Sequence, residues 1–169
     1  QPKKIYAEDV QYSTAVSESV ANKIGSSLNY VLDNFDDYVF GIEGAPYSGL
    51  AAYPAQVGSI ENLRSNCVIT DIIISNEVSG TASATEFKIE RQPAAGGSWT
   101  NIFSVNCTIN NTAADGLIFN MNGSSPSNVT LPVLSISSFS QNDKLRFTLV
   151  TAATGAENLE VHVIMRPTA

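Results

Sequence analysis

The sequence predicts a mainly β protein: an antiparallel β-sandwich preceded by an N-terminal helix and an irregular arm. Two observations predict the sandwich. Short β-branched or alternating segments follow one another from residue 67 onward, and no helical pattern separates them. A third observation sets the first part of the chain apart, because apolar residues there recur at helical spacing. With 169 residues, the chain has room for one domain of ordinary size and an appended segment.

The first element is a helix predicted over residues 14–36, inside an N-terminal anchor segment of residues 1–40. Ser13 or Thr14 can cap its start, and Gly25 is its weak point. Its apolar residues are spaced by fours and a three and so share one face: Val16, Val20, Ile24, Leu28, Val31 and Phe35. We call this face the apolar stripe. Either the chain's own sandwich or the same stripe on neighbouring chains must cover it, and the spacing leaves both open.

Residues 41–66 form the second segment, which reads GIEGAPYSGLAAYPAQVGSIENLRSN. Glycine, proline and small residues recur in it without a sustained period. This composition predicts a linker or an irregular wrapping arm between the helix and the sandwich.

Residues 67–169 carry the sandwich, with about seven strands predicted at short, fairly even spacing. Leu145, Phe147 and Leu149 alternate with polar residues, as a strand with one buried face requires. Leu159 and Val161 begin the same pattern in the last strand. Strand spacing does not decide the topology, and among the sandwiches we choose a jelly roll.

The charge of the chain argues against two classes of partner. Acidic residues outnumber basic ones by 16 to 9, and Lys3 and Lys4 are neighbouring cations at the very start. Binding to a phosphate backbone needs aligned cations, so we expect no nucleic acid and no anionic membrane as partners. No stretch approaches the run of about 20 apolar residues that spans a bilayer, and the first residues lack the apolar centre of a signal peptide.

Two cysteines, Cys67 and Cys107, lie in strand-like sequence. Two cysteines are too few for a disulfide framework or a four-ligand metal site, which leaves one bridge or two thiols. We favour buried free thiols, because an apolar strand is where an unpaired cysteine usually lies.

Catalytic signatures are hard to find, so we expect no enzyme, no cofactor and no metal. The single histidine, His162, alternates with core-facing valines and is expected on the wetter face of its strand. Asp33, Asp36 and Asp37 lack the alternating spacing of a calcium loop. A carboxylate pair such as Glu86 with Glu90 or Asp71 would be the basis for a glycosidase, which we rank last.

The single tryptophan, Trp99, follows a turn-forming PAAGGS stretch at the start of a predicted strand. A tryptophan in this position usually packs into the edge of a sandwich. The alternative is an exposed ring that stacks on a sugar, which makes Trp99 the candidate contact for a glycan.

Two long segments resemble the jelly-roll virion proteins of tailed bacteriophages and related trimeric fibre-tip domains. They are CVITDIIISNEVSGTASATEFKIERQPAAGGSWTNIFS and VTLPVLSISSFSQNDKLRFTLVTAATGAENLEVHVIM. The second is similar to the pattern LPVLS…F…GD.LR…L..A.TG..ENL.V that closes such domains, with Asn142 in the place of a turn glycine. The earlier STAVSESVANKIGSSLNYVLDNF looks like the short N-terminal helix that joins three chains in this family.

The resemblance implies a structural protein on a virion surface, as a trimeric capsid decoration or cement protein or as part of a fibre. Its partners would be two sister chains, through the apolar stripe, and the major capsid protein or other virion proteins. The alternative is a carbohydrate-binding adhesin, a receptor-binding fibre tip that contacts a host surface glycan. In that case the protein would belong to a fibre on a virion, on a bacterial surface or in secreted form.

Overall fold

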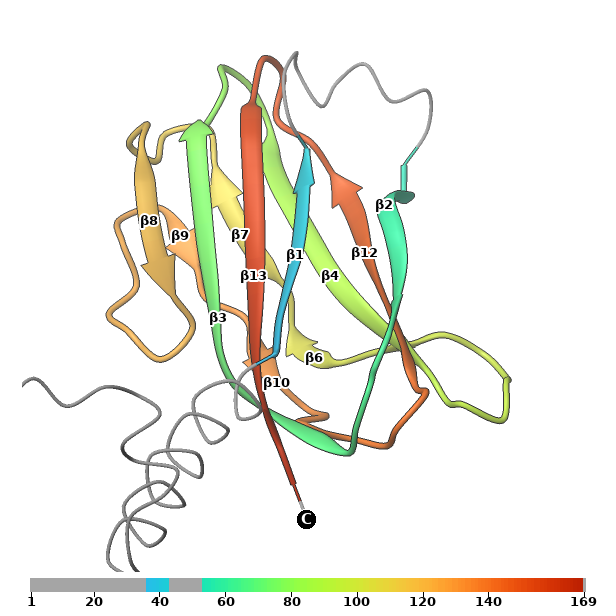
Figure 1. The fold of residues 1–169 in the computed structure, drawn as a ribbon. Coiled ribbons are helices and arrows are strands. Elements are labelled where there is room, and N and C mark those ends of the chain that lie inside the picture. Colours follow the sequence, from blue (N-terminus) through green and yellow to red (C-terminus); the bar gives the residue numbers. More distant parts are fainter. Residues whose placement is uncertain (1–35, 43–52, 169) are drawn as a thin grey trace, which may run out of the picture. The chain divides into compact units, whose positions relative to one another are not determined.

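In the computed structural model, residues 36–42 and 53–168 are described. The chain divides after Phe35, and all the described residues belong to the unit that begins at Asp36. Every strand pairing in this part is antiparallel, which confirms the predicted mainly β, antiparallel class. Figure 1 shows the strands, with the last one, β13, lying between β3 and β1.

The first sheet, sheet A, has the order β1-β13-β3-β11, and β8 pairs with β3 beside β11. Its longest members are β3 and β13, whose central residues pair across His162 and Ile73. The strands are β1 (Asp36–Ile42), β3 (Cys67–Val78), β8 (Leu117–Asn120), β11 (Ser138–Phe139) and β13 (Glu157–Pro167). Alternation in β13 buries Leu159, Val161 and Val163, as the sequence predicts.

The second sheet, sheet B, has the order β2-β12-β4-β7-β9, and β5 also pairs with β4. Its strands are β2 (Ala55–Asn62), β4 (Ala84–Gln92), β5 (Thr100–Asn101), β7 (Cys107–Asn110), β9 (Val129–Thr130) and β12 (Lys144–Thr151). A separate two-stranded ribbon joins β6 (Phe103–Val105) to β10 (Val133–Leu134). Residues 98–109 and 128–136 are therefore each divided among short strands, and the second segment breaks at Pro132, which lacks the N–H that a ladder needs.

The two sheets bury their inner faces against each other. Phe40 of sheet A stacks on Phe147 of sheet B, with ring centroids 6.2 Å apart. Phe87 lies on the other neighbouring strand of sheet B, 5.2 Å from the Phe147 ring. The three rings link β1, β12 and β4 and so form the centre of one core.

Two predictions for the first 66 residues fail where the structure describes them. Residues 55–62, expected to lie in an irregular arm, form β2 and pair with β12 from Ala55 to Asn62. Asp36, expected to end the helix, is the first residue of β1. Neither segment alternates cleanly in sequence, and each becomes a strand because a well-patterned neighbour, β12 or β13, offers it a ladder of hydrogen bonds. Residues 14–35 of the predicted helix lie outside the described residues.

Gly80 lies where the β3–β4 turn meets the β12–β13 turn. Its φ is +91°, and a Cβ atom there would lie 2.6 Å from the Thr154 carbonyl oxygen. The same carbonyl accepts a hydrogen bond from the Thr81 N–H, at 2.8 Å, so it is not free to move away. Only glycine therefore fits this contact between the two turns.

We expect Gly80→Ala to lower the free energy of unfolding by about 3 kcal/mol, because a left-handed φ is combined with a backbone clash. Gly155→Ala is the matched control, since Gly155 has a φ of +73° but nothing within 4 Å of an added Cβ. It should cost only about 1 kcal/mol. Urea denaturation of both variants measures the difference, and equal losses would contradict the close contact.

Candidate functional site

The outer face of sheet B carries a cluster of charged and polar side chains. One row of cross-strand partners runs over it from Ile60 on β2 through Arg146 on β12 and Glu90 on β4 to Asn101 on β5. Directly paired residues point to the same side of a sheet, so these four side chains share one face. Ile60 is 42% exposed, whereas Glu90 is only 5% exposed.

Glu90 is the centre of this cluster. Arg146 Nε donates to Glu90 Oε2 at 2.9 Å, and the Thr148 hydroxyl donates to the same oxygen at 2.7 Å. Lys88 Nζ lies 2.9 Å from the other oxygen, Oε1. Burial by itself raises the pKa of Glu90, but the hydrogen bonds from Arg146, Lys88 and Thr148 and the charge of Lys88 outweigh it and hold the pKa below its usual value. Glu90 is therefore a fixed carboxylate that orients two cations.

Trp99 covers this cluster from the segment that leads into β5. The Arg146 guanidinium carbon lies 4.4 Å from the centroid of the Trp99 ring, well inside the range of a cation–π contact. The side chain is half-buried, so it neither enters the core nor stands free on a loop. The sequence left two alternatives for Trp99, packing at the edge of the sandwich or exposure as a contact for a sugar. In the structure Trp99 packs on the outer face of sheet B, and part of its ring remains exposed.

A second buried carboxylate, Asp143, ties together the loops at one end of sheet B. It accepts from Arg91 Nε at 2.7 Å and from the backbone N–H groups of Ala94 and Ser140, each at 2.9 Å. Burial by itself raises the pKa of Asp143. The hydrogen bonds from Ser140, Arg91 and Ala94 and the charge of Arg91 outweigh this effect and hold the pKa below its usual value. Since every partner is a structural group, we assign Asp143 a role in stability.

The two carboxylates predict how stability depends on pH. Because the pKa values of Glu90 and Asp143 are lowered by folding, the unfolded chain binds protons more readily than the folded one. Their contribution is complete above the ordinary carboxyl pKa values and is lost as the pH falls through the folded values. We expect a flat free energy of unfolding above about pH 5 and a steep loss below about pH 4. Glu90→Gln should flatten the slope of the acid limb in denaturation curves; an unchanged slope would contradict the assignment.

The cysteines are free thiols in the structure, and both are buried, which confirms the sequence-based preference. Cys67 lies on β3 of sheet A, with its sulfur 3.4 Å from that of Met165, whereas Cys107 lies on β7 of sheet B. Burial raises the pKa of the Cys107 thiol, so this group is held in its protonated form.

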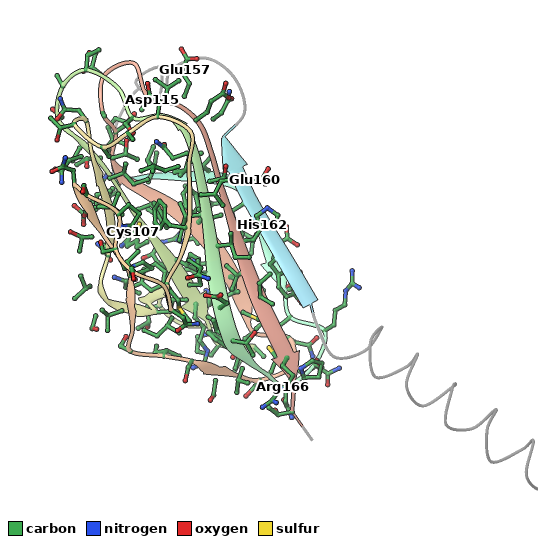
Figure 2. All side chains as sticks on the ribbon, turned by 90° about the vertical axis from the view of Figure 1, so that its left-hand side faces the viewer. Cys107, Asp115, Glu157, Glu160, His162 and Arg166 are labelled. Atoms are coloured by element: carbon green, nitrogen blue, oxygen red, sulfur yellow. The ribbon has the colours of Figure 1, made fainter. Side chains whose placement is uncertain are left out.

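His162 lies on the outer face of sheet A, as predicted, between two fully buried valines. Its Nε2 is 2.5 Å from Glu160 Oε1, and Figure 2 shows the two residues on the same strand, β13. Of the two candidate glycosidase pairs, Glu86 and Asp71 lie on different sheets, B and A. Glu86 and Glu90 lie on one strand, β4, and Asn106 holds the first while Arg146, Thr148 and Lys88 hold the second.

Several candidates from the sequence lie outside the described residues. They are the apolar stripe, Asp33 and the predicted N-terminal anchor up to residue 35. Among residues 36–42 and 53–168, no three His, Cys, Asp or Glu side chains gather in a way that could hold a metal ion. Within the same ranges, no helix is both long and apolar enough to cross a membrane.

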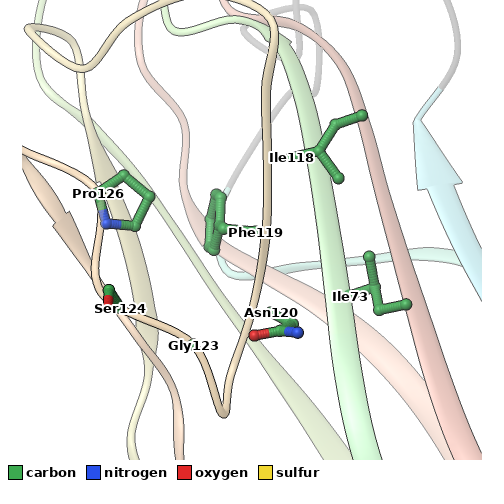
Figure 3. A pocket seen from close by; sticks show the side chains of 7 residues that line it. All are labelled: Ile73, Ile118, Phe119, Asn120, Gly123, Ser124 and Pro126. Carbon is green, nitrogen blue, oxygen red and sulfur yellow. The ribbon is translucent and has the colours of Figure 1, made fainter.

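A shallow groove of about 480 Å³ opens beside β8 on sheet A (Figure 3). Ile73, Phe119 and Pro126 line it, together with Ile118, which is 75% exposed. The loop after β8 is held to β3, because Asn122 Nδ2 donates to the Thr70 carbonyl oxygen at 3.0 Å. The groove is mainly apolar and holds no charged side chain among its lining residues.

Comparison with known proteins gives two likenesses among solved structures. One is to the capsid of Ralstonia phage GP4, with 12% identity, a TM-score of 0.45, and coverage of 80% of this chain and 86% of that chain. The other is to the SPBc2 prophage-derived protein YomS, with 18% identity, a TM-score of 0.33, and coverage of 77% and 94%. At these TM-scores neither likeness carries an argument about function. No family model matches the sequence, and no curated protein matches it.

Proposed function

We propose that the protein is a structural component of a virion surface, a homotrimer that decorates or cements the head or forms part of a short fibre. The observation that carries the proposal is the order of the strands. In sheet A, β13 separates β1 from β3, and in sheet B, β12 separates β2 from β4. Successive strands of the pairs β1 and β2, β3 and β4, and β12 and β13 lie in opposite sheets.

This strand order supports a jelly roll, the topology of many viral capsid and lectin domains. The resemblance of residues 67–104 and 129–165 to jelly-roll virion proteins then selects the virion among the uses of that fold. A protein of this kind acts by burying area against capsid and sister chains. The apolar stripe supplies the seam between sister chains in this proposal, around a threefold axis.

The oligomeric state tests the trimer. Light scattering on the purified full chain should give the mass of three chains at micromolar concentration. Ile24→Asp with Leu28→Asp places two charges in the stripe and should give monomers. Asn22→Asp with Ser26→Asp has the same spacing on the opposite face of the predicted helix and should leave the trimer intact. A monomeric wild-type chain, or equal effects of the two double variants, would refute the seam.

The virion location needs its own experiment. An antibody raised against the folded chain should label the outer surface of intact particles purified from an infected culture. The chain should also co-purify with those particles through a density gradient. A chain found in the particle-free fraction alone would contradict the location whatever its oligomeric state.

A further inference from the structure

The outer face of sheet B presents a preorganised combination of an aromatic ring and a cation. Arg146 is held by Glu90 through Nε, at 2.9 Å, while its guanidinium lies over the Trp99 ring at 4.4 Å. Fixing a side chain before a ligand arrives removes part of the entropy cost of binding. The cluster therefore has the feature that separates a binding site from a loosely charged surface.

The way in which Arg146 is held leaves its donor fork available. Its hydrogen bond to Glu90 uses Nε, and the side chain remains 25% exposed. The two terminal amino groups of a guanidinium match the two oxygens of a carboxylate, and this bidentate geometry is one that lysine does not reproduce. An incoming carboxylate can therefore bind beside the Trp99 ring.

The cation beside Trp99 favours an anionic ligand, although the whole chain carries a net charge of −7. Lys88 and Arg146 both contact Glu90, and Arg146 is the one that lies over the Trp99 ring. The other carboxylate on this face of β4 is Glu86, which lies about 7 Å along the strand from Lys88 and about 13 Å from Glu90. Asn106 Nδ2 already donates to its Oε1, at 2.7 Å.

The surroundings of Trp99 suit a ligand whose ring has polar groups at its edge and C–H groups on its face. The indole ring is partly exposed. Asn101 points to the same side of the sheet as Glu90, but its Nδ2 donates to Asn106 Oδ1 at 2.8 Å and its Oδ1 accepts from the Phe103 N–H at 3.1 Å, so its amide serves the fold. Aromatic faces pack against the C–H groups of sugar rings, while charged groups bind the polar groups around them. A carboxylate-bearing pyranose combines the groups that Trp99 and Arg146 each recognise.

We propose that Trp99, Arg146 and Lys88 form a binding site for a saccharide that carries a carboxylate, such as a uronic acid unit of a surface polysaccharide. The site lies on sheet B, whereas the groove beside β8 lies on sheet A. It is independent of the structural role proposed above, and neither proposal falls with the other.

The chain itself provides the probe, because Trp99 is its single tryptophan, and tryptophan emission excited selectively over the six tyrosines reports on this site. The full chain is titrated with methyl glucuronide, with methyl glucoside and with acetate. We expect a saturable change in fluorescence with the glucuronide, with a dissociation constant of about 1 mM, typical of a small ligand bound by a few groups. The glucoside should bind at least about tenfold more weakly, since it lacks the charged contact with Arg146.

Two variants localise the effect. Arg146→Lys keeps the charge but loses the fork, and it should weaken glucuronide binding about tenfold. Arg166→Lys is the matched control on the far end of β13, in the other sheet, and should bind like the wild type. Far-ultraviolet circular dichroism and the melting temperature establish that each variant is folded, and the glucuronide measurement is repeated by calorimetry as a second readout.

Three results would overturn the proposal. The first is the absence of a saturable change with the glucuronide in the folded wild-type chain. The second is equal binding of the glucoside, which would remove the requirement for a carboxylate. The third is acetate binding as tight as the glucuronide, which would reduce the site to an anion contact without a role for the sugar ring.

Discussion

Phe147→Ala should lower the free energy of unfolding by about 4 kcal/mol, the largest loss that we expect from a single apolar substitution in this protein. Phe147 is 1% exposed and lies between the rings of Phe40 and Phe87. Its removal takes away the ring contacts with Phe40 and Phe87 and leaves a cavity that neither ring can fill without moving its strand. For a domain of marginal stability, this loss is a large part of the whole.

The measurement is urea or guanidinium denaturation followed by circular dichroism. Val105→Ala is the control, since Val105 lies on the small β6–β10 ribbon and is 42% exposed. It should change the free energy of unfolding by less than about 1 kcal/mol. If Phe147→Ala behaves like Val105→Ala, the Phe40–Phe147 contact does not hold the sheets together.

Asp143→Ala should destabilise the protein by about 3 kcal/mol, because it removes a buried carboxylate from two backbone donors and from Arg91, which is itself partly exposed. The substitution leaves the Arg91 guanidinium without its carboxylate and removes the acceptor of the Ala94 and Ser140 N–H groups. All three donors lie close to a carboxylate that is 1% exposed, so water cannot replace it without opening the loops. We therefore expect local opening around residues 93–97 and 140–143 before global unfolding.

Hydrogen exchange measured by mass spectrometry distinguishes this loop opening from a general loss of stability. Peptides covering residues 93–97 and 140–143 should lose protection in the variant, while peptides from β13 keep it under native conditions. Glu157→Ala is the control, because Glu157 is a partly exposed carboxylate on β13, far from both loops. Uniform loss of protection in Asp143→Ala would show that the carboxylate acts on the whole core and has no special role in the loops.

Much of the β structure could be predicted because apolar and polar residues alternate over short stretches of the sequence. The alternation in residues 144–151 and 157–167 fixed both the strands and their buried faces, since only one side of each can be apolar. Asn142, which stands where the resembling domains have a glycine, has a φ of +66°. Asparagine is one of the few other residues that tolerates this left-handed conformation, so the departure from the pattern preserves the turn.

The candidate site could be predicted only in part. Its single tryptophan was visible as a candidate contact, but the partner of that ring, Arg146, is 47 positions further along the chain and carries no local signal. Glu90 was considered as half of a catalytic pair with Glu86, whereas its actual partners are Lys88, Arg146 and Thr148. The sequence did offer one signal for this site. Glu90 and Arg146 are opposite charges at outward positions of two predicted strands, and such residues can pair when the strands are neighbours.

The sequence by itself determined the antiparallel β class and the buried faces of the well-patterned strands, because each depends on residues near one another in the chain. It favoured buried thiols at Cys67 and Cys107 over a bridge, and the structure confirmed this choice. The tertiary structure alone decided that residues 55–62 become β2, that β12 and β13 separate earlier strands, and that Trp99 lies on Arg146. The physical reason is that a weakly patterned segment takes its conformation from the ladder it completes. A site made from three strands acquires its geometry only when the register between those strands is set.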